Sequence, residues 1–190
     1  MVYFYSYQAC VKFEDKNTCA VQGTDPETGC YGQITYNFDR VFDPDSGQEE
    51  IYNEAIVPII ESVLEGFNGT VLAYGQTSSG KTHTMVGPSI EDPKHQGIIP
   101  RMVKTVFEKI ENASEDIEFT VKISMIEIYM EKIKDLLDPA KTNLKVHEEK
   151  NKGLYIADVT ETYVGEDIEV YEVMKTGNDN RAIGVTDMNK

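Results

Sequence analysis

The chain has 190 residues, which suggests one domain with a real core, and its hydrophobic content of 40% and charged content of 27% are ordinary for a globular protein. Its 33 acidic residues against 18 basic ones give a net charge of −15, which argues against nucleic acid and anionic membranes as partners. Contact with an acidic protein would need a local basic patch.

Signals for export and for membrane insertion are not found in the sequence. No apolar run approaches the length of a membrane span, and the first residues lack the basic and apolar regions of a signal peptide. The cysteines, Cys10, Cys19 and Cys30, are an odd number without a Cys-x-x-Cys pair. They therefore predict a reducing compartment, with neither a disulfide framework nor a zinc site.

Short strands and turns are expected over residues 2–33, with weak alternation of apolar and polar side chains at 11–13 and 19–21, and a strand is predicted at residues 36–42. A helix is predicted from about residue 48 to 66, with Ser46 as the candidate cap. Pro58 lies in the middle of its apolar stripe and predicts a kink, because proline removes one backbone hydrogen bond.

Residues 69–74 are a short apolar run that predicts a buried strand, and a phosphate-binding pattern, Gly-x-x-x-x-Gly-Lys-Ser/Thr, follows at once. Glycines in this pattern let backbone N–H groups turn around phosphate oxygens, because no Cβ blocks positive φ. The lysine would reach the β- and γ-phosphates, and the threonine hydroxyl would bind Mg²⁺ at the start of a helix. The residues of the pattern are Gly75, Gln76, Thr77, Ser78, Ser79, Gly80, Lys81 and Thr82.

The second half of the chain continues the alternation of helices and strands. An exposed loop is expected at residues 87–97, and Pro100 then starts a helix with an apolar stripe. A strand is predicted over residues 119–129. The order of elements indicates an α/β fold.

Three further elements are predicted after this strand. The spacing of Ile133, Leu136 and Leu137 predicts a short helix, and residues 143–147 and 154–159 predict a hairpin. A last helix is expected from residue 166 to 176, with Gly177 on its C-terminal side.

The fuller phosphate-loop sequence, AYGQTSSGKTHTM at residues 73–85, resembles the kinesin motor domain, most of all that of conventional kinesin heavy chains. The resemblance is continuous from about residue 36 to 189. It implies a P-loop NTPase fold of kinesin type, a central mixed, mainly parallel sheet flanked by helices, incomplete in this chain. Residues 1–190 would then be a single partial motor domain. Further segments match the family in order: 38–42, 68–70, 97–101, 127–129, 135–137, 143–144, 146–148 and 180–181.

The resemblance implies an ATP-hydrolysing motor that moves along microtubules in the cytoplasm, with ATP or ADP and Mg²⁺ as ligands. By position, residues 76–82 would hold the phosphates, Lys81 would act in catalysis and Thr82 would bind the metal. His83 resembles the family's histidine beside the adenine, although a histidine on a helix near a sheet is more often a packing residue. The loop at residues 87–97 matches a variable insert next to the nucleotide pocket.

A basic group near the second hairpin resembles a family loop that faces tubulin, which is acidic. It comprises Lys141, His147, Lys150 and Lys152. A solvated hairpin tip explains the same residues as well, and Glu148 and Glu149 weaken the positive charge.

Several family segments are missing from the sequence. The first-strand Arg-x-Arg-Pro motif has no counterpart before Val11, and neither the Asn-x-x-Ser-Ser-Arg-Ser-His nor the Asp-x-x-Gly switch is found, nor a dimerisation region. We therefore expect the chain alone to fold poorly and to show no microtubule-stimulated ATPase. The alternative function is a non-catalytic nucleotide-binding or interaction fragment; a small-molecule kinase is a third hypothesis, which the ordered motifs disfavour.

Overall fold

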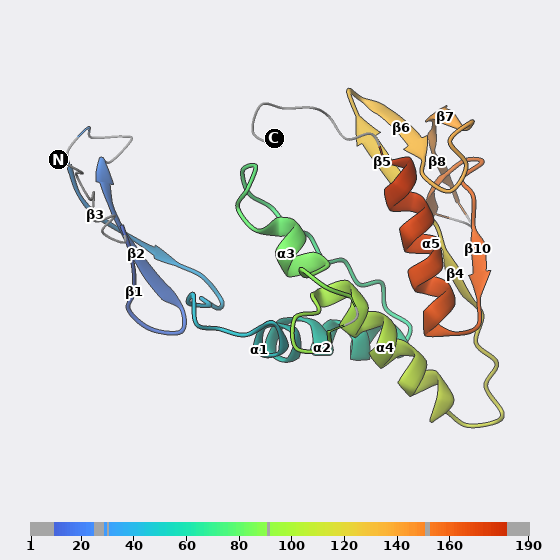
Figure 1. Cartoon of the computed structure of the whole chain (residues 1–190), viewed down its shortest axis with the longest axis horizontal. Helices are drawn as coiled ribbons and strands as arrows, with labels where there is room; N and C mark the ends of the chain where they lie inside the picture. Colours follow the sequence, from blue (N-terminus) through green and yellow to red (C-terminus); the bar gives the residue numbers. More distant parts are fainter. Residues whose placement is uncertain (1–9, 25–28, 30, 91, 151–152, 182–190) are drawn as a thin grey trace.

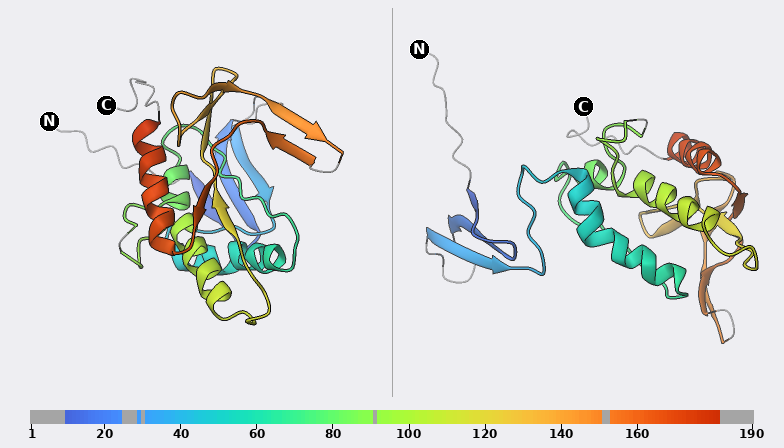
Figure 2. Two further views of the ribbon diagram at one scale, coloured as in Figure 1. Left: turned by 90° about the vertical axis from the view of Figure 1, so that its right-hand side faces the viewer. Right: turned by 90° about the horizontal axis from the view of Figure 1, so that it is seen from below.

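The computed structural model describes residues 10–24, 29, 31–90, 92–150 and 153–181. A three-stranded sheet near the N-terminus stands apart from the helices, and the remaining strands gather beside the last helix (Figure 1). Seen from below, the connected helices α1 and α2 lie between these two parts (Figure 2, right). Cys30, Lys152 and the segment 182–190, on which sequence expectations were placed, lie outside the described residues.

The N-terminal sheet is an antiparallel meander of β1 (Val11–Phe13), β2 (Thr18–Thr24) and β3 (Tyr31–Asn37). Of its described residues only Ala20 is buried, so the sheet contributes little to the core. The strand expected over residues 36–42 ends at Asn37, because the next segment crosses the β1–β2 turn: the Phe38 N–H bonds to the Asn17 carbonyl and the Val41 N–H to the Lys16 carbonyl.

One arginine ties this sheet to the first helix. Arg40 lies 3.0 Å from a carboxylate oxygen of Glu50 and 2.5 Å from one of Glu54, and its guanidinium stacks on the Phe42 ring. The hydrogen bond to Glu54 raises the pKa of Arg40 and lowers that of Glu54. All of these groups are near the surface, so we expect each pair to stabilise the fold only modestly.

The predicted kink at Pro58 takes the form of a π-helical turn. The helix consists of α1 (Gln48–Ile51), the π-helical segment η1 (Tyr52–Ile56) and α2 (Val57–Leu64). The Val57 N–H bonds to the Tyr52 carbonyl five residues back, just before the proline that cannot donate. The expected Ser46 cap is wrong: Gly47 is the N-cap, and the Ser46 hydroxyl bonds to Asp43 instead.

Two apolar clusters share the long helix α4 (Ile98–Glu111). The first joins it to the helix before the phosphate-binding pattern and contains Tyr52, Ile56, Ile60 and Ile98. The second joins it to α5 (Asp167–Asn180) and to the antiparallel pair β4 (Val121–Ile123) and β10 (Thr162–Val164), and contains Val103, Val164, Val170 and Met174. Helix α4 begins two residues before the expected start, with Pro100 still in its first turn.

The short helix predicted around Ile133 is wrong, because these residues form a hairpin. Strand β5 (Ile126–Tyr129) pairs with β6 (Lys132–Asp135) through a two-residue turn, and β6 continues to β7 (Thr142–Leu144). The turn residues Met130 and Glu131 have φ of 49° and 60°, the conformation of a tight hairpin turn that matches the strand twist. The hairpin predicted from residues 143–147 and 154–159 exists with shifted bounds, as β8 (Val146–Glu149) and β9 (Gly153–Ile156), while residues 143–144 belong to β7.

Two further expectations differ from the structure. Gly177 lies inside α5, which runs on to Asn180. The absence of a side chain there lets the helix approach Met125 closely, since a Cβ would overlap the Met125 sulfur. The mainly parallel central sheet is not assembled among the described residues, where all strand pairs are antiparallel. Among the described residues, the helices lack the combination of length and apolar character that a membrane-spanning segment needs.

Asp135, at the end of β6, is a buried carboxylate with only 1% of its surface exposed. Its oxygens accept hydrogen bonds from the backbone N–H groups of Thr160 at 2.6 Å, Leu137 at 2.8 Å and Asp138 at 3.1 Å. Burial alone would raise the pKa of this group, but the bonds led by the Thr160 N–H outweigh it, and the pKa is lowered. The charged aspartate therefore holds the β6 turn against the segment before β10.

Replacing Asp135 by asparagine is expected to destabilise the chain by about 1–3 kcal/mol at pH 7, because one amide NH₂ would face a backbone donor. The folded-state pKa is depressed, so the carboxylate's contribution is present above its unfolded pKa of about 3.9 and is lost as the pH falls through the lower folded value. Urea unfolding at pH 7 and in acid measures both effects.

The control is Asp39→Asn, at an exposed aspartate whose carboxylate has no hydrogen bond among the described residues. Equal stability of the two variants at pH 7 would contradict the role given to Asp135.

Candidate functional site: the glycine-rich loop before α3

The segment leading into the site, residues 69–74, is not the buried strand that its apolar residues predict. It carries no strand pairing, and only Val71 packs on the first apolar cluster. Leu72 and Tyr74 are 83% and 95% exposed. A strand needs neighbours that accept its backbone hydrogen bonds, and no described strand lies beside this segment.

The loop at residues 75–80 has the backbone conformation that its glycines permit. Gly75 and Gly80 have φ of 153° and 95°, and Ser78 between them has φ of 66°. A Cβ on Gly75 would overlap the Ser79 side chain, and residues with a side chain rarely adopt its positive φ, so this position favours glycine. Gly80 is the N-cap of α3 (Lys81–Met85), which begins directly after the loop.

Lys81 reaches back across the loop. Its ammonium group donates to the carbonyl oxygens of Gly75 at 2.8 Å and Gln76 at 2.7 Å. An ammonium group has three N–H donors, so one is left for an anion over the loop. The Thr82 side chain is exposed one position further on, and its hydroxyl bonds to none of the described residues.

His83 is held by a residue that the sequence patterns did not single out for the site. The side-chain nitrogen of Gln48, the first residue of α1, lies 2.7 Å from the His83 carbonyl oxygen and 3.1 Å from the imidazole Nδ1. The two residues are 35 positions apart, and no local motif signals their contact.

The loop at residues 87–97 closes on itself next to α3. The Gly97 N–H bonds to the Val86 carbonyl at 2.9 Å, and Arg101 of α4 donates to the Gln96 and Pro93 carbonyls at 3.1 and 2.7 Å. Near its tip, the His95 ring bonds to Asp92 at 2.6 Å and lowers the pKa of that carboxyl. The expected exposed loop is thus a closed unit anchored on the core helix.

The expected basic group is only partly brought together. Lys141 is half-buried and donates to the Thr160 hydroxyl at 3.0 Å, so it supports the fold at the end of β6. His147 is exposed on β8 with its ring 5.9 Å from that of Tyr155, and Lys150 follows the same strand, also exposed. Lys152 lies outside the described residues.

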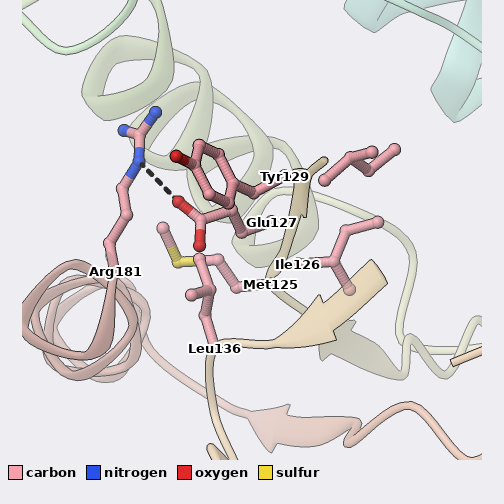
Figure 3. A pocket seen from close by; sticks show the side chains of 7 residues that line it. Met125, Ile126, Glu127, Tyr129, Leu136 and Arg181 are labelled. Atoms are coloured by element: carbon pink, nitrogen blue, oxygen red, sulfur yellow. Dashed lines mark ion pairs between the residues drawn. The ribbon is translucent and has the colours of Figure 1, made fainter. Parts of the chain in front are cut away.

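A second polar site, which sequence reasoning missed, lies between β5 and the end of α5 (Figure 3). It is a cavity of about 470 Å³ in which Arg181 Nε lies 3.9 Å from Glu127 Oε1. The other oxygen, Oε2, is buried without a hydrogen bond in the described part of the chain. The sequence signal that could have pointed to this site is Glu127, a charged residue between Ile126 and Ile128 in one apolar strand.

The model of the family described as "Kinesin motor domain" matches residues 5–190. The chain is 46% identical over 183 residues to the kinesin heavy chain of Neurospora crassa, covering 96% of this chain and 19% of that protein. It is 48% identical over 176 residues to the kinesin-1 heavy chain of Homo sapiens, covering 93% and 18%. The chain thus spans about a fifth of the length of the curated relatives it matches.

A solved structure, "Structure of a fast kinesin: Implications for ATPase mechanism and interactions with microtubules", superposes with a TM-score of 0.86 at 46% identity. The match covers 96% of this chain and 50% of that one. The fold is therefore that of P-loop NTPases. The chain belongs to the kinesin motor-domain family, as the motifs around residues 73–85 predict.

Gly87→Ala is expected to open the closed loop and to destabilise the chain by more than about 1 kcal/mol, because Gly87 has φ of 85° and a Cβ would meet the backbone at His95 and Gly97. Thermal unfolding measures the loss.

The matched control is Gly32→Ala on β3, where a Cβ would meet nothing within 4 Å and φ is not positive. If both alanines shift the unfolding temperature alike, the close packing of the loop neck is not what Gly87 provides.

Proposed function

We propose that residues 75–83 bind Mg²⁺-ATP and that this chain is the nucleotide-binding part of an ATP-driven microtubule motor. The observation that carries the proposal is the loop's geometry: positive φ at Gly75 and Gly80, and the Lys81 ammonium drawn across the loop. Backbone N–H groups turned inward around such a loop suit the oxygens of a phosphate.

The residues present fit the expected ligand. The Lys81 ammonium would offset the charge of the β- and γ-phosphates, and the exposed Thr82 hydroxyl would be a ligand of Mg²⁺. The metal, when bound, neutralises charge that develops on the phosphates. His83, two residues after Lys81 in α3, would contact the adenine.

The partner proposed is the acidic surface of the microtubule, in the cytoplasm. Lys150 is exposed beside the exposed His147 on the β8–β9 hairpin, which places one cationic group where an acidic surface can meet it. Lys152 lies outside the described residues, and Lys141 donates to the Thr160 hydroxyl and is left out of the proposed contact.

Lys81→Ala is expected to weaken ATP binding at least about a hundredfold, because the phosphates lose the ammonium group that offsets their negative charge. Calorimetric titration of the chain with ATP, with and without Mg²⁺, measures this, and Thr82→Ala should lose only the Mg²⁺-dependent part. The charge-matched control is Lys104→Ala, on the exposed side of α4. Unchanged affinity in the Lys81 variant, or no binding by the wild type, would overturn the proposal.

Lys150→Glu is expected to weaken co-sedimentation with microtubules about fivefold, with the effect shrinking as salt is added, because exposed charges are screened. Lys104→Glu makes the same charge change away from the hairpin and should leave binding unaltered. If the two variants behave alike, net charge and not the hairpin governs the interaction.

A further inference from the structure

The contact between Gln48 and His83 has a defined direction. The Gln48 side-chain atom lies 2.7 Å from the His83 carbonyl oxygen, which is only an acceptor. An amide oxygen placed there would oppose another oxygen, so the NH₂ group must occupy this position. Its second hydrogen then points to the imidazole Nδ1 at 3.1 Å.

This direction sets the state of the ring. Because an amide nitrogen accepts no hydrogen bond, Nδ1 has to be the acceptor and carries no proton. The neutral ring is therefore the tautomer with its proton on Nε2. The Nδ1 edge and the backbone of His83 are both held by one side chain, so the free edge that a ligand meets is the Nε2–H edge of an exposed ring.

Gln48 is well placed to act as a fixed support. It is the first residue of α1, which continues through η1 and α2 into the first apolar cluster, whereas α3 is a single short helix directly after the loop. A bond from the packed helix to His83 restricts both the ring and the backbone of α3. Without it, an exposed imidazole would rotate about two side-chain torsions.

We propose that Gln48 is a positioning residue for binding of the nucleotide's purine base: its amide fixes His83 in the Nε2–H tautomer and in one orientation beside the glycine-rich loop. This inference rests on the proposed function and adds to it a residue and a direction of hydrogen bonding. It assigns Gln48 no contact with the phosphates, which distinguishes it from a general role in holding the loop.

The first test needs no nucleotide. Nitrogen-15 NMR of the whole chain, at about two pH units above the ordinary histidine pKa, reports which nitrogen of His83 is protonated. The expected result is a proton on Nε2 and an unprotonated, hydrogen-bonded Nδ1. In Gln48→Met, which keeps the length and helix preference of the side chain, the Nδ1 signal should lose its hydrogen-bond shift. A proton on Nδ1 in the wild type would overturn the inference.

The second test compares two ligands, ATP and inorganic tripolyphosphate. Gln48→Met should weaken ATP binding about fivefold, the typical effect of one lost hydrogen bond, and leave tripolyphosphate binding within about twofold. The neighbouring control Glu49→Gln, at an exposed residue of the same helix turn, should change neither. Equal losses for both ligands, or no loss for ATP, would refute a role in base binding.

A double-variant cycle tests the route through the histidine. Once His83→Ala has removed the ring, adding Gln48→Met should cause no further loss of ATP affinity, whereas additive losses would contradict the inference. Failure of the proposed function looks different: the wild type would bind neither ATP nor tripolyphosphate. The NMR result would still decide whether Gln48 holds His83.

Discussion

The burial of α4 on two faces is the constraint on which the rest of the structure depends. Ile98, Met102 and Val106 pack toward the helix that precedes the glycine-rich loop, and Ile99, Val103 and Phe107 pack toward α5 and the β4–β10 pair. Both apolar clusters therefore meet on one helix. Each cluster buries one apolar face of α4, so both faces of the helix are removed from water. The same helix carries Arg101, whose bonds close the loop at residues 87–97 beside α3.

The glycine-rich loop combines local and distant constraints. Its conformation is local, because positive φ at Gly75 and Gly80 follows from the absence of a side chain. The orientation of His83 depends on a distant residue, because its ring and its carbonyl bond to Gln48 at the start of another helix. The conformation of the loop can thus be predicted from neighbouring residues, whereas the position of His83 beside it depends on a helix that packs elsewhere.

Membership of the kinesin motor-domain family gives these features a common context. The glycine-rich loop, the closed loop beside it and the exposed β8–β9 hairpin are separate surfaces of the chain, carried by different elements. The Glu127–Arg181 pair adds a polar cavity at the end of α5 that belongs to none of them (Figure 3). The described strands share only antiparallel pairs, and apolar side chains such as Leu72 stay exposed beside the glycine-rich loop.

The sequence by itself determined the glycine-rich loop before α3, the family and the long helices, because these depend on residue types and spacing within a few turns of chain: the stripe on α4 and the Pro58 distortion were both predictable. Only the tertiary structure decided which short apolar runs pair. Ile133 belongs to a hairpin and not to a helix, and residues 69–74 form no strand. The tertiary structure likewise showed that Lys141 bonds to Thr160 and that Gln48 bonds to His83. Short strands and single polar contacts gain their free energy from residues far away in the chain, which local periodicity does not encode.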